Sequence, residues 1–197
     1  AWAYEALSFG GFWAWDPVEN ASLVPWLLLA AGLHTLVIYK HTGYSLHATL
    51  ILLSLSFIMV MYSSFLTKSG ILGDSSVHSF TDMGMSGQLI LCIAVFAIPM
   101  LYLFVSRWKI MAIPAQEEQT SSREFWMFVG ALVFFIAAIF ISLMTSLPVF
   151  NKIFDTKYAA QDAAKYNSVT IWMAIFAAIL SAAAQWLSYK KSDHRKA

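Results

Sequence analysis

Residues Phe9 to Ser22 read FGGFWAWDPVENAS, and this stretch joins an aromatic segment to the first long hydrophobic segment of the chain. Two glycines directly precede three closely spaced aromatic residues, Phe12, Trp13 and Trp15. The glycines have no side chains, which leaves space beside the bulky rings. Aromatic rings stack on flat apolar molecules through their faces. The stretch therefore predicts a shelf that suits a flat apolar ligand.

The second half of the stretch predicts the start of a helix. Asp16 is a residue type that caps helices, and Pro17 has the backbone φ that a first helical turn needs. Glu19 follows three positions after the cap, in a capping-box-like pattern. Asp16 and Glu19 therefore have a structural role that is compatible with a functional one.

The composition is that of an integral membrane protein. Of the 197 residues, 59% are hydrophobic and only 12% are charged, and a soluble domain of this size cannot bury that much apolar surface. The net charge of +1 gives no electrostatic support to nucleic-acid binding. The single cysteine, Cys92, excludes an intrachain disulfide, and its apolar surroundings predict a small buried filler.

Five apolar runs are long enough to cross about 30 Å of hydrocarbon as helices. We therefore predict an all-α membrane helix bundle, in which residues 1–197 form a single membrane domain. The predicted spans are Pro17–Lys40, Tyr44–Leu66, Met85–Trp108, Glu124–Leu147 and Ser168–Tyr189. The chain does not begin with Met, and we expect it to be a fragment or a split subunit of a longer protein.

The basic residues predict an orientation for these spans. Eight of the twelve Lys and Arg residues fall on one side of the predicted spans and four fall on the other. The positive-inside rule assigns the side with eight to the cytoplasm, together with the C-terminus. Phe9–Ser22, the loop Thr67–Gly84 and the loop Pro148–Asn167 then lie outside, on the periplasmic face in a bacterium.

Two histidines are candidate ligands. His34 lies within the first span, where an ionisable side chain favours a functional site, although a neutral His bonded to a neighbouring helix is an equal alternative. His78 lies in the long loop Thr67–Gly84, and long loops are frequently functional, although a loop His is commonly only a polar residue. His34 follows Pro17 by 17 residues, which puts it about 25 Å deeper than the aromatic shelf. His34 and His78 therefore cannot bind the same metal ion.

The surroundings of His34 leave two further alternatives open. Ala30, Ala31 and Gly32 precede it, and such small residues allow either a helix or a ring to approach closely. His47, in the second span, lies at a similar depth, so a metal ion shared by His34 and His47 is a strained alternative.

The segment FGGFWAWDPVENASLVPWL, followed by a helix that carries His34, resembles the tryptophan-rich WWD signature of the cytochrome c assembly family of haem-handling membrane proteins. Within that family the chain is most similar to the haem lyase subunits. The supporting segments, in family order, are LTKSGIL at 66–72, VHSF at 77–80, SREF at 122–125, SLPVFN at 146–151 and YN at 166–167.

The resemblance implies two haem sites. One is an external aromatic platform for haem b, the WWD segment 9–26, with His78 from the external loop 67–84 as a ligand of the iron. The other is a membrane-embedded haem b with His34 as a ligand, and the partner histidine of each iron is expected outside residues 1–197. The residues implied to contact haem are Phe12, Trp13, Trp15, Asp16, Glu19, Asn20, Trp26, His34 and His78.

The platform departs from the family pattern at two positions. Phe9 and Phe12 stand where the family usually has Trp. Phenylalanine keeps a ring for stacking but lacks the indole N–H, which could meet a haem propionate. Lys68, Asn20 and Ser22 are candidate substitutes for that donor.

The resemblance also implies a function, which is c-type cytochrome biogenesis at the bacterial inner membrane. The protein would present haem for thioether attachment to apocytochrome c, together with other maturation subunits. The sequence contains no recognisable nucleophile or acid–base pair, which argues against an ordinary hydrolase. The alternatives are a non-catalytic haem carrier or exporter of the same family and a membrane scaffold whose aromatic residues only form an interfacial belt.

Overall fold

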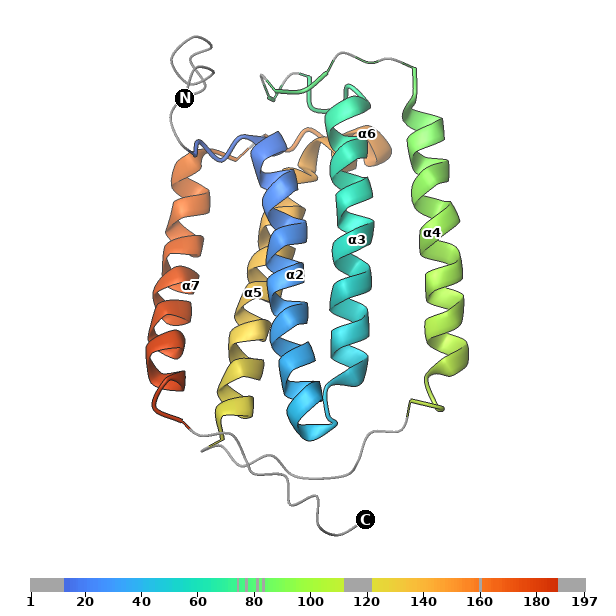
Figure 1. The fold of residues 1–197 in the computed structure, drawn as a ribbon. Coiled ribbons are helices and arrows are strands. Elements are labelled where there is room, and N and C mark those ends of the chain that lie inside the picture. The colour runs from blue at the N-terminus through green and yellow to red at the C-terminus, as the bar shows by residue number, and fades with distance from the viewer. Residues whose placement is uncertain are drawn as a thin grey trace, which may run out of the picture.

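The computed structural model describes residues 13–73, 75–76, 78–80, 82, 84–111, 122–159 and 161–187. These residues form long helices that run side by side, and none of the residues described is in a strand (Figure 1). The helices are α2 (Pro17–Thr42), α3 (Leu46–Lys68), α4 (Ser86–Arg107), α5 (Arg123–Thr145), α6 (Leu147–Phe154) and α7 (Ala163–Ala184). All except α6 are long and apolar enough to cross a membrane, which makes five spans. The predicted all-α bundle with five spans is confirmed.

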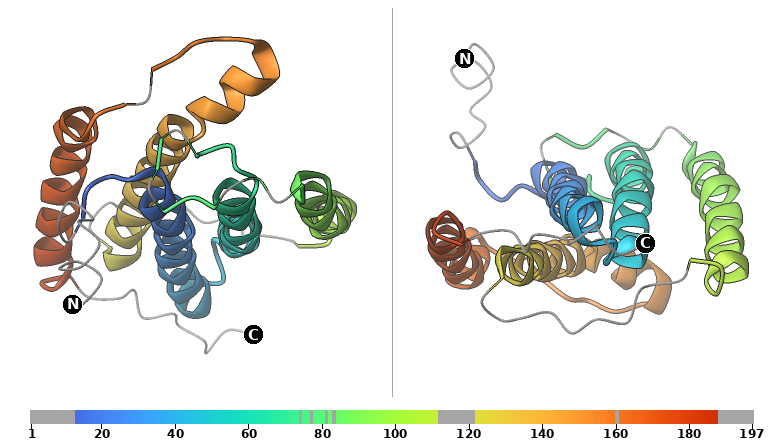
Figure 2. Two further views of the ribbon diagram at one scale, coloured as in Figure 1. Left: turned by 90° about the horizontal axis from the view of Figure 1, so that it is seen from above. Right: turned by 60° about the horizontal axis from the view of Figure 1, so that its bottom comes forward.

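The prediction was wrong about the segment that follows α5. We expected a loop over Pro148–Asn167, but the chain forms α6 there, lying across the bundle axis (Figure 2), and α7 already begins at Ala163. Pro148 stands in the first turn of α6, where its fixed φ suits a helix. Asp162 caps α7, because its carboxylate accepts a hydrogen bond from the Lys165 amide N–H at 2.9 Å. A proline start and an aspartate cap therefore set these two helices.

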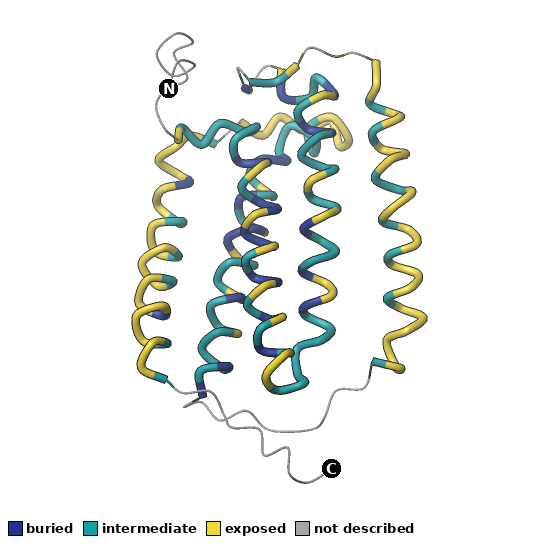
Figure 3. The backbone as a smooth tube through the Cα atoms, viewed as in Figure 1, coloured by how far each residue is buried: buried dark blue, intermediate teal, exposed yellow. Residues whose placement is uncertain are grey.

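Helix α2 lies at the centre of the bundle, between α3 and α5 (Figure 2). Helix α7 packs against α5, and α4 packs against α3 alone. Dark blue, buried positions are concentrated on α2 and α5 in Figure 3. The main cluster of buried side chains contains Val24, Leu27, Leu28, Ala31, Leu52, Ala131, Ala137, Ala138, Ile141 and Tyr166.

Two contacts explain how closely α2 and α3 pack. A Cβ atom on Gly32 would lie 2.7 Å from Leu53 Cδ2 and 3.3 Å from the Leu53 backbone nitrogen, so a larger residue here would require Leu53 to shift. Ser56 Oγ donates a hydrogen bond of 2.8 Å to the Pro25 carbonyl oxygen on the neighbouring helix. Small residues and interhelical hydrogen bonds are the usual means of joining helices in lipid. The small residues around Gly32 thus admit a helix.

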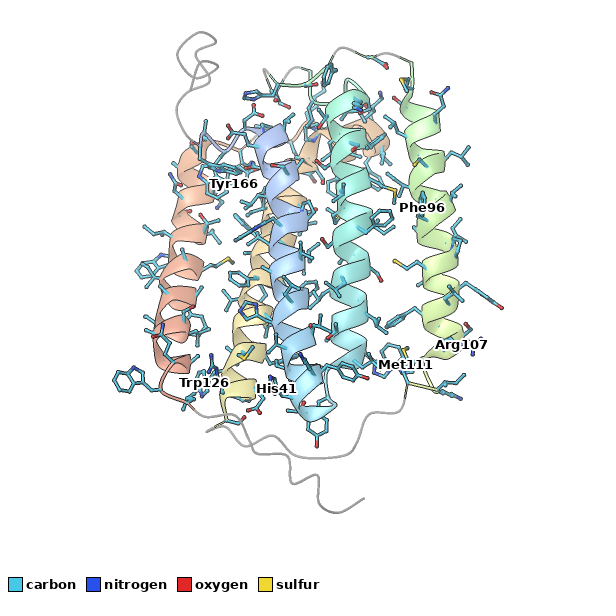
Figure 4. All side chains as sticks on the ribbon, in the orientation of Figure 1. His41, Phe96, Arg107, Met111, Trp126 and Tyr166 are labelled. Atoms are coloured by element: carbon cyan, nitrogen blue, oxygen red, sulfur yellow. The ribbon has the colours of Figure 1, made fainter. Side chains whose placement is uncertain are left out.

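Helix α4 is the most exposed of the five spans, and none of its residues is buried. Its contacts with α3 include the Phe96 ring, which meets the Phe57 ring edge-on at 5.4 Å (Figure 4). Cys92, on α4, is exposed, so the prediction that it fills a buried gap was wrong. The helix is apolar on all sides, and the sequence alone could not tell which side faces the bundle.

The start of α2, the loop between α3 and α4, and α6 share one end of the bundle (Figure 1). The described Lys and Arg residues divide equally between the two ends. Lys68, Lys152, Lys157 and Lys165 belong to this end, and Lys40, Arg107, Lys109 and Arg123 belong to the other. The four remaining basic residues follow α7 and lie outside the described residues. The charge asymmetry that predicts the orientation therefore depends on that C-terminal segment.

Candidate functional site at the start of helix α2

Asp16 is the N-cap of α2, as predicted. Its Oδ1 atom accepts a hydrogen bond of 2.9 Å from the Val18 amide N–H, and Pro17 is in the first turn. Glu19 does not complete a capping box, because its Oε2 atom accepts from the Ala14 amide N–H at 3.0 Å, two residues before the cap. Both carboxylates therefore bind backbone, and Glu19 fixes the segment that leads into the helix.

Trp15 is held by α7. Its ring stacks on Tyr166 with a centroid separation of 5.0 Å and an angle of 7° between the planes. Its indole Nε1–H donates to Asn167 Oδ1 at 2.7 Å. In Figure 4, Tyr166 is labelled at the upper end of α7, towards the start of α2. One face of the Trp15 ring is thus already covered by the protein.

The aromatic shelf is therefore narrower than the sequence suggests. Trp13 meets Trp15 edge-on, with centroids 6.0 Å apart and planes at 90°, and Trp13 is 38% exposed. Among the shelf residues that the structure describes, Trp13 offers the more accessible ring. Phe12, the third residue of the predicted shelf, lies outside the described residues, as does Phe9.

Asn20 fixes an unusual backbone conformation at Trp15. Trp15 has a φ of 57°, in the left-handed region, which costs a residue with a side chain about 1–2 kcal/mol. Asn20 is fully buried, and its Nδ2 atom donates to the Trp15 carbonyl oxygen at 3.0 Å. The buried Tyr166 hydroxyl faces the side chains of Asn20 and Thr145. Asn20 is thus part of a polar cluster that holds the turn before α2.

His78 lies at this end of the bundle, directly against the cap of α2. Its Nδ1 atom is 3.2 Å from Asp16 Oδ1, and the side chains are 22% and 11% exposed. Ser76 Oγ donates to the same Asp16 oxygen at 2.7 Å and accepts from the His78 amide N–H at 3.1 Å. The expected grouping of His78 with the aromatic segment is confirmed.

His34 lies on α2 far from His78 and packs against α5. Its Nδ1 atom is 2.7 Å from the Ala30 carbonyl oxygen, and its ring meets Phe134 edge-on at 5.7 Å. A carbonyl oxygen can only accept, so Nδ1 carries the proton and, in the neutral ring, Nε2 keeps the lone pair. This is the nitrogen by which a neutral imidazole binds a metal.

A metal ion shared by His34 and His47 is contradicted by the structure. The His47 ring packs on Trp108 with centroids 4.0 Å apart, and its Nε2 is 3.2 Å from the Trp108 carbonyl oxygen. His47 is therefore directed towards the end of α4, whereas His34 is directed towards α5. Among the described residues, no group of three or more His, Cys, Asp or Glu could hold a metal ion.

Trp26 and the candidate propionate donors have distinct surroundings. Trp26 is 59% exposed and belongs to an outward stripe of α2 with Leu29 and Leu33, which suits contact with lipid. Of the candidate donors, Asn20 is committed to Trp15, and Ser22 Oγ donates to the Glu19 carbonyl oxygen at 2.7 Å. Lys68, at the end of α3, is exposed and is the candidate donor that carries a positive charge.

The comparisons with known proteins point to one family. Residues 1–72 match the family model described as cytochrome C assembly protein. The chain is 30% identical to the cytochrome c-type biogenesis protein CcmF of Escherichia coli K12 over 198 residues, covering 100% of this chain and 30% of that protein. It is 45% identical to the Rhodobacter capsulatus cytochrome c-type biogenesis protein ccl1 over 95 residues, or 48% of this chain and 14% of that protein.

A third relative extends the pattern. The chain is 29% identical to the probable cytochrome c-type biogenesis protein NrfE of Escherichia coli K12 over 191 residues, covering 96% of this chain and 34% of that protein. The chain thus spans about a third or less of the length of these relatives. No solved structure matches the fold. The family model matches the part of the chain that contains α2 and α3, and CcmF aligns along the whole length of this chain, so the chain is similar to the cytochrome c assembly proteins.

Proposed function

We propose that this protein acts in c-type cytochrome biogenesis by binding haem beside the start of α2 and presenting it for thioether attachment to apocytochrome c. The observation that carries the proposal is the contact between His78 Nδ1 and Asp16 Oδ1 at 3.2 Å. It brings an imidazole, a common axial ligand of haem iron, next to the aromatic segment. Haem would be the substrate of this site.

The chemistry of this donor set fits haem. Because the Asp16 carboxylate, 3.2 Å from Nδ1, favours a proton on that nitrogen, Nε2 would be the His78 nitrogen that keeps a lone pair for iron. Trp13 is 38% exposed and offers a ring for the flat macrocycle. Asp16 and Glu19 are anionic and disfavour haem propionates beside them, whereas Lys68 is a cation at the same end of the bundle.

The residues would act by orientation. Ligation of the iron and stacking of the macrocycle would direct the vinyl groups at the cysteine thiols of an apocytochrome segment, where each thiol adds across a vinyl double bond. Holding both reactants in register replaces a bimolecular encounter and can contribute several kcal/mol, up to roughly 7–11 in the best cases. The enzyme role that we propose is therefore that of a haem lyase component that acts by orienting its two reactants.

His34 supports a second haem site, inside the membrane. Its Nδ1–H is held by the Ala30 carbonyl oxygen, so the lone pair of the neutral ring is on Nε2, as an iron ligand requires. When bound, a haem b at this site would supply an electron that keeps the external iron ferrous. The partner histidine of each iron would come from outside residues 1–197.

The setting that we propose is the bacterial inner membrane, with the start of α2 and His78 on the periplasmic side and the C-terminus in the cytoplasm. Other cytochrome c maturation subunits and the apocytochrome would then meet the protein at its periplasmic end. This orientation follows from the positive-inside rule and depends on the basic residues after α7.

The test is haem content in the intact protein purified from membranes, with His78→Ala and His34→Ala made separately. Each should lower the haem that its site retains by at least about tenfold, since even outer-shell changes cost 10- to 100-fold. His47→Ala is the matched control, because His47 packs on Trp108 instead of lining either site. Unchanged haem content and spectra in both variants would refute the proposal.

A second measurement separates a lyase component from a haem carrier. The complex is supplied with haem and a peptide that contains the Cys-x-x-Cys-His motif, and thioether product is followed by mass spectrometry. Product that depends on His78 supports the lyase role. Transfer of haem to another protein without thioether product would instead favour a carrier, and a native complex without haem would favour a scaffold.

A further inference from the structure

One oxygen atom of Asp16 joins the start of α2 to the loop that carries His78. Oδ1 accepts from the Val18 amide N–H at 2.9 Å and from Ser76 Oγ at 2.7 Å, and lies 3.2 Å from His78 Nδ1. Ser76 lies 60 residues further along the chain. The carboxylate is thus shared between a helix cap and a distant histidine.

We propose that Asp16 is a positioning residue for His78: its carboxylate keeps the proton on Nδ1 and fixes the ring so that Nε2 faces the ligand. The inference rests on the proposed function for the role of the metal. The state of the His78 ring can be measured without any metal.

Capping alone does not account for Asp16. Ser, Thr and Asn cap a helix about as well as Asp, and one accepted hydrogen bond is sufficient. Asp162, the N-cap of α7, does only this work: it accepts from the Lys165 amide N–H at 2.9 Å, and it is exposed. Asp16 is 11% exposed and has two further partners from the loop. Comparison of Asp16 with Asp162 therefore separates the effect of the histidine contact from the effect of helix capping.

The loop is arranged around the carboxylate through two routes. His78 reaches Asp16 directly with Nδ1, and its amide N–H donates at 3.1 Å to Ser76 Oγ, which in turn donates to Asp16. The backbone and the side chain of His78 are therefore both linked to the same Asp16 oxygen, the backbone through Ser76 and the side chain directly.

The 3.2 Å approach of the Asp16 carboxylate to His78 Nδ1 is a charge contact without hydrogen-bond geometry, and its negative charge favours a proton on that nitrogen. A carboxylate beside the far ring nitrogen favours the tautomer with the proton there and makes the ligating nitrogen more basic. A more basic ligand donates more strongly to ferric iron and lowers its reduction potential. Removal of the negative charge should therefore raise the potential, and removal of the contact should also weaken binding.

Two substitutions at Asp16 separate these effects while the cap is kept. Asp16→Asn preserves an accepting oxygen at the same distance but removes the charge. Asp16→Ser keeps a capping hydroxyl but is too short to reach His78. Asp162→Asn and Asp162→Ser are the matched controls, since they make the same changes at a cap of another membrane helix with no histidine partner.

The first readout uses the protein without haem. The protein is labelled with ¹⁵N-histidine, and its NMR spectrum is recorded at neutral pH. The His78 signal is identified by its loss in His78→Gln, and its chemical shifts should report a proton on Nδ1. In Asp16→Ser the proton should redistribute between Nδ1 and Nε2, and in the Asp162 variants it should not. A proton on Nε2 in the wild type, or an unchanged tautomer in Asp16→Ser, would overturn the proposal whatever the protein binds.

The second readout uses the intact protein with haem. Asp16→Ser should weaken haem binding about 10- to 100-fold, and Asp16→Asn should raise the reduction potential of the His78-dependent haem with a smaller loss of binding. If haem binding depends on His78 but neither Asp16 variant differs from its Asp162 counterpart, the positioning role is wrong and the proposed function stands. If no haem depends on His78, the proposed function fails, and the tautomer measurement alone decides the role of Asp16.

Discussion

The Trp15 indole N–H donates to Asn167 Oδ1 at 2.7 Å, and this hydrogen bond joins residues that are 152 positions apart in the chain. Together with the stacked ring of Tyr166, it fixes the aromatic segment to the first turn of α7. The Trp15 ring, part of the predicted aromatic shelf, thus also connects α2 to α7.

The interaction between Trp15 and Asn167 should be measurable as a coupling energy in a double-mutant cycle. Trp15→Phe keeps a ring against Tyr166 but removes the N–H, and Asn167→Ala removes the acceptor. Each should lower the free energy of unfolding by about 0.5–1.5 kcal/mol, and the double variant should cost less than the sum. Thermal unfolding in detergent measures all three, and strict additivity would show that the pair does not interact.

Asn20 should be the most sensitive polar residue at the start of α2. Asn20→Ala removes the donor that holds the Trp15 carbonyl in a left-handed turn, and it leaves buried polar groups without a partner, which costs about 1–3 kcal/mol. Ser22→Ala, on the same helix, removes an exposed hydroxyl and should change the unfolding free energy by less than about 0.5 kcal/mol. Equal losses in the two variants would contradict the role assigned to Asn20.

A methyl group at Gly32 should be destabilising, because Leu53 would have to shift to admit it. Gly32→Ala places Cβ 2.7 Å from Leu53 Cδ2 and should destabilise the protein by about 1–3 kcal/mol through overpacking. Leu53→Ala should restore part of the loss in the double variant. Gly130→Ala is the control, because nothing lies within 4 Å of its Cβ position on α5, and it should be neutral or stabilising. A neutral Gly32→Ala would mean that α2 and α3 can move apart at no cost.

Ser56 should contribute a small, specific link between α2 and α3. Ser56→Ala removes the donor to the Pro25 carbonyl oxygen and should cost about 0.6 kcal/mol, the average for such bonds between membrane helices. Ser64→Ala is the comparison, since Ser64 Oγ donates to the Val60 carbonyl oxygen within α3 and joins no second helix. If both variants unfold at the same midpoint, the interhelical bond adds nothing.

Local sequence patterns predicted the features that depend on local physics. The first four spans end within two residues of their predicted limits, because an apolar run must match the membrane thickness. Asp16 was predicted as a cap from its neighbours, and the depth of His34 followed from the rise of a helix. His78 was assigned to the same end as the aromatic segment because two spans lie between them, and an even number of spans returns the chain to the same side of the membrane.

The features that the sequence did not predict depend on contacts between distant segments. Nothing in the periodicity near Trp15 indicates that Tyr166 and Asn167 cover it, although YN at 166–167 is one of the family segments. Ser76 had no signal of its own, since a serine in a polar loop is unremarkable until its partner is known. Helix α6 has only eight residues and a proline, a composition that also suits a loop.

The two neighbours Trp15 and Asp16 also impose an order on biosynthesis. A ribosome that has made α2 and α3 has made the pair that packs most closely, but Asp16 gains its loop partners only after His78 emerges, and Trp15 gains Asn167 later still. Domains form from the N-terminus as synthesis proceeds. The contacts of Trp15 are therefore completed only after the start of α7 has been translated, so a chain truncated before α7 would contain α2 yet lack the contacts of Trp15 with Tyr166 and Asn167.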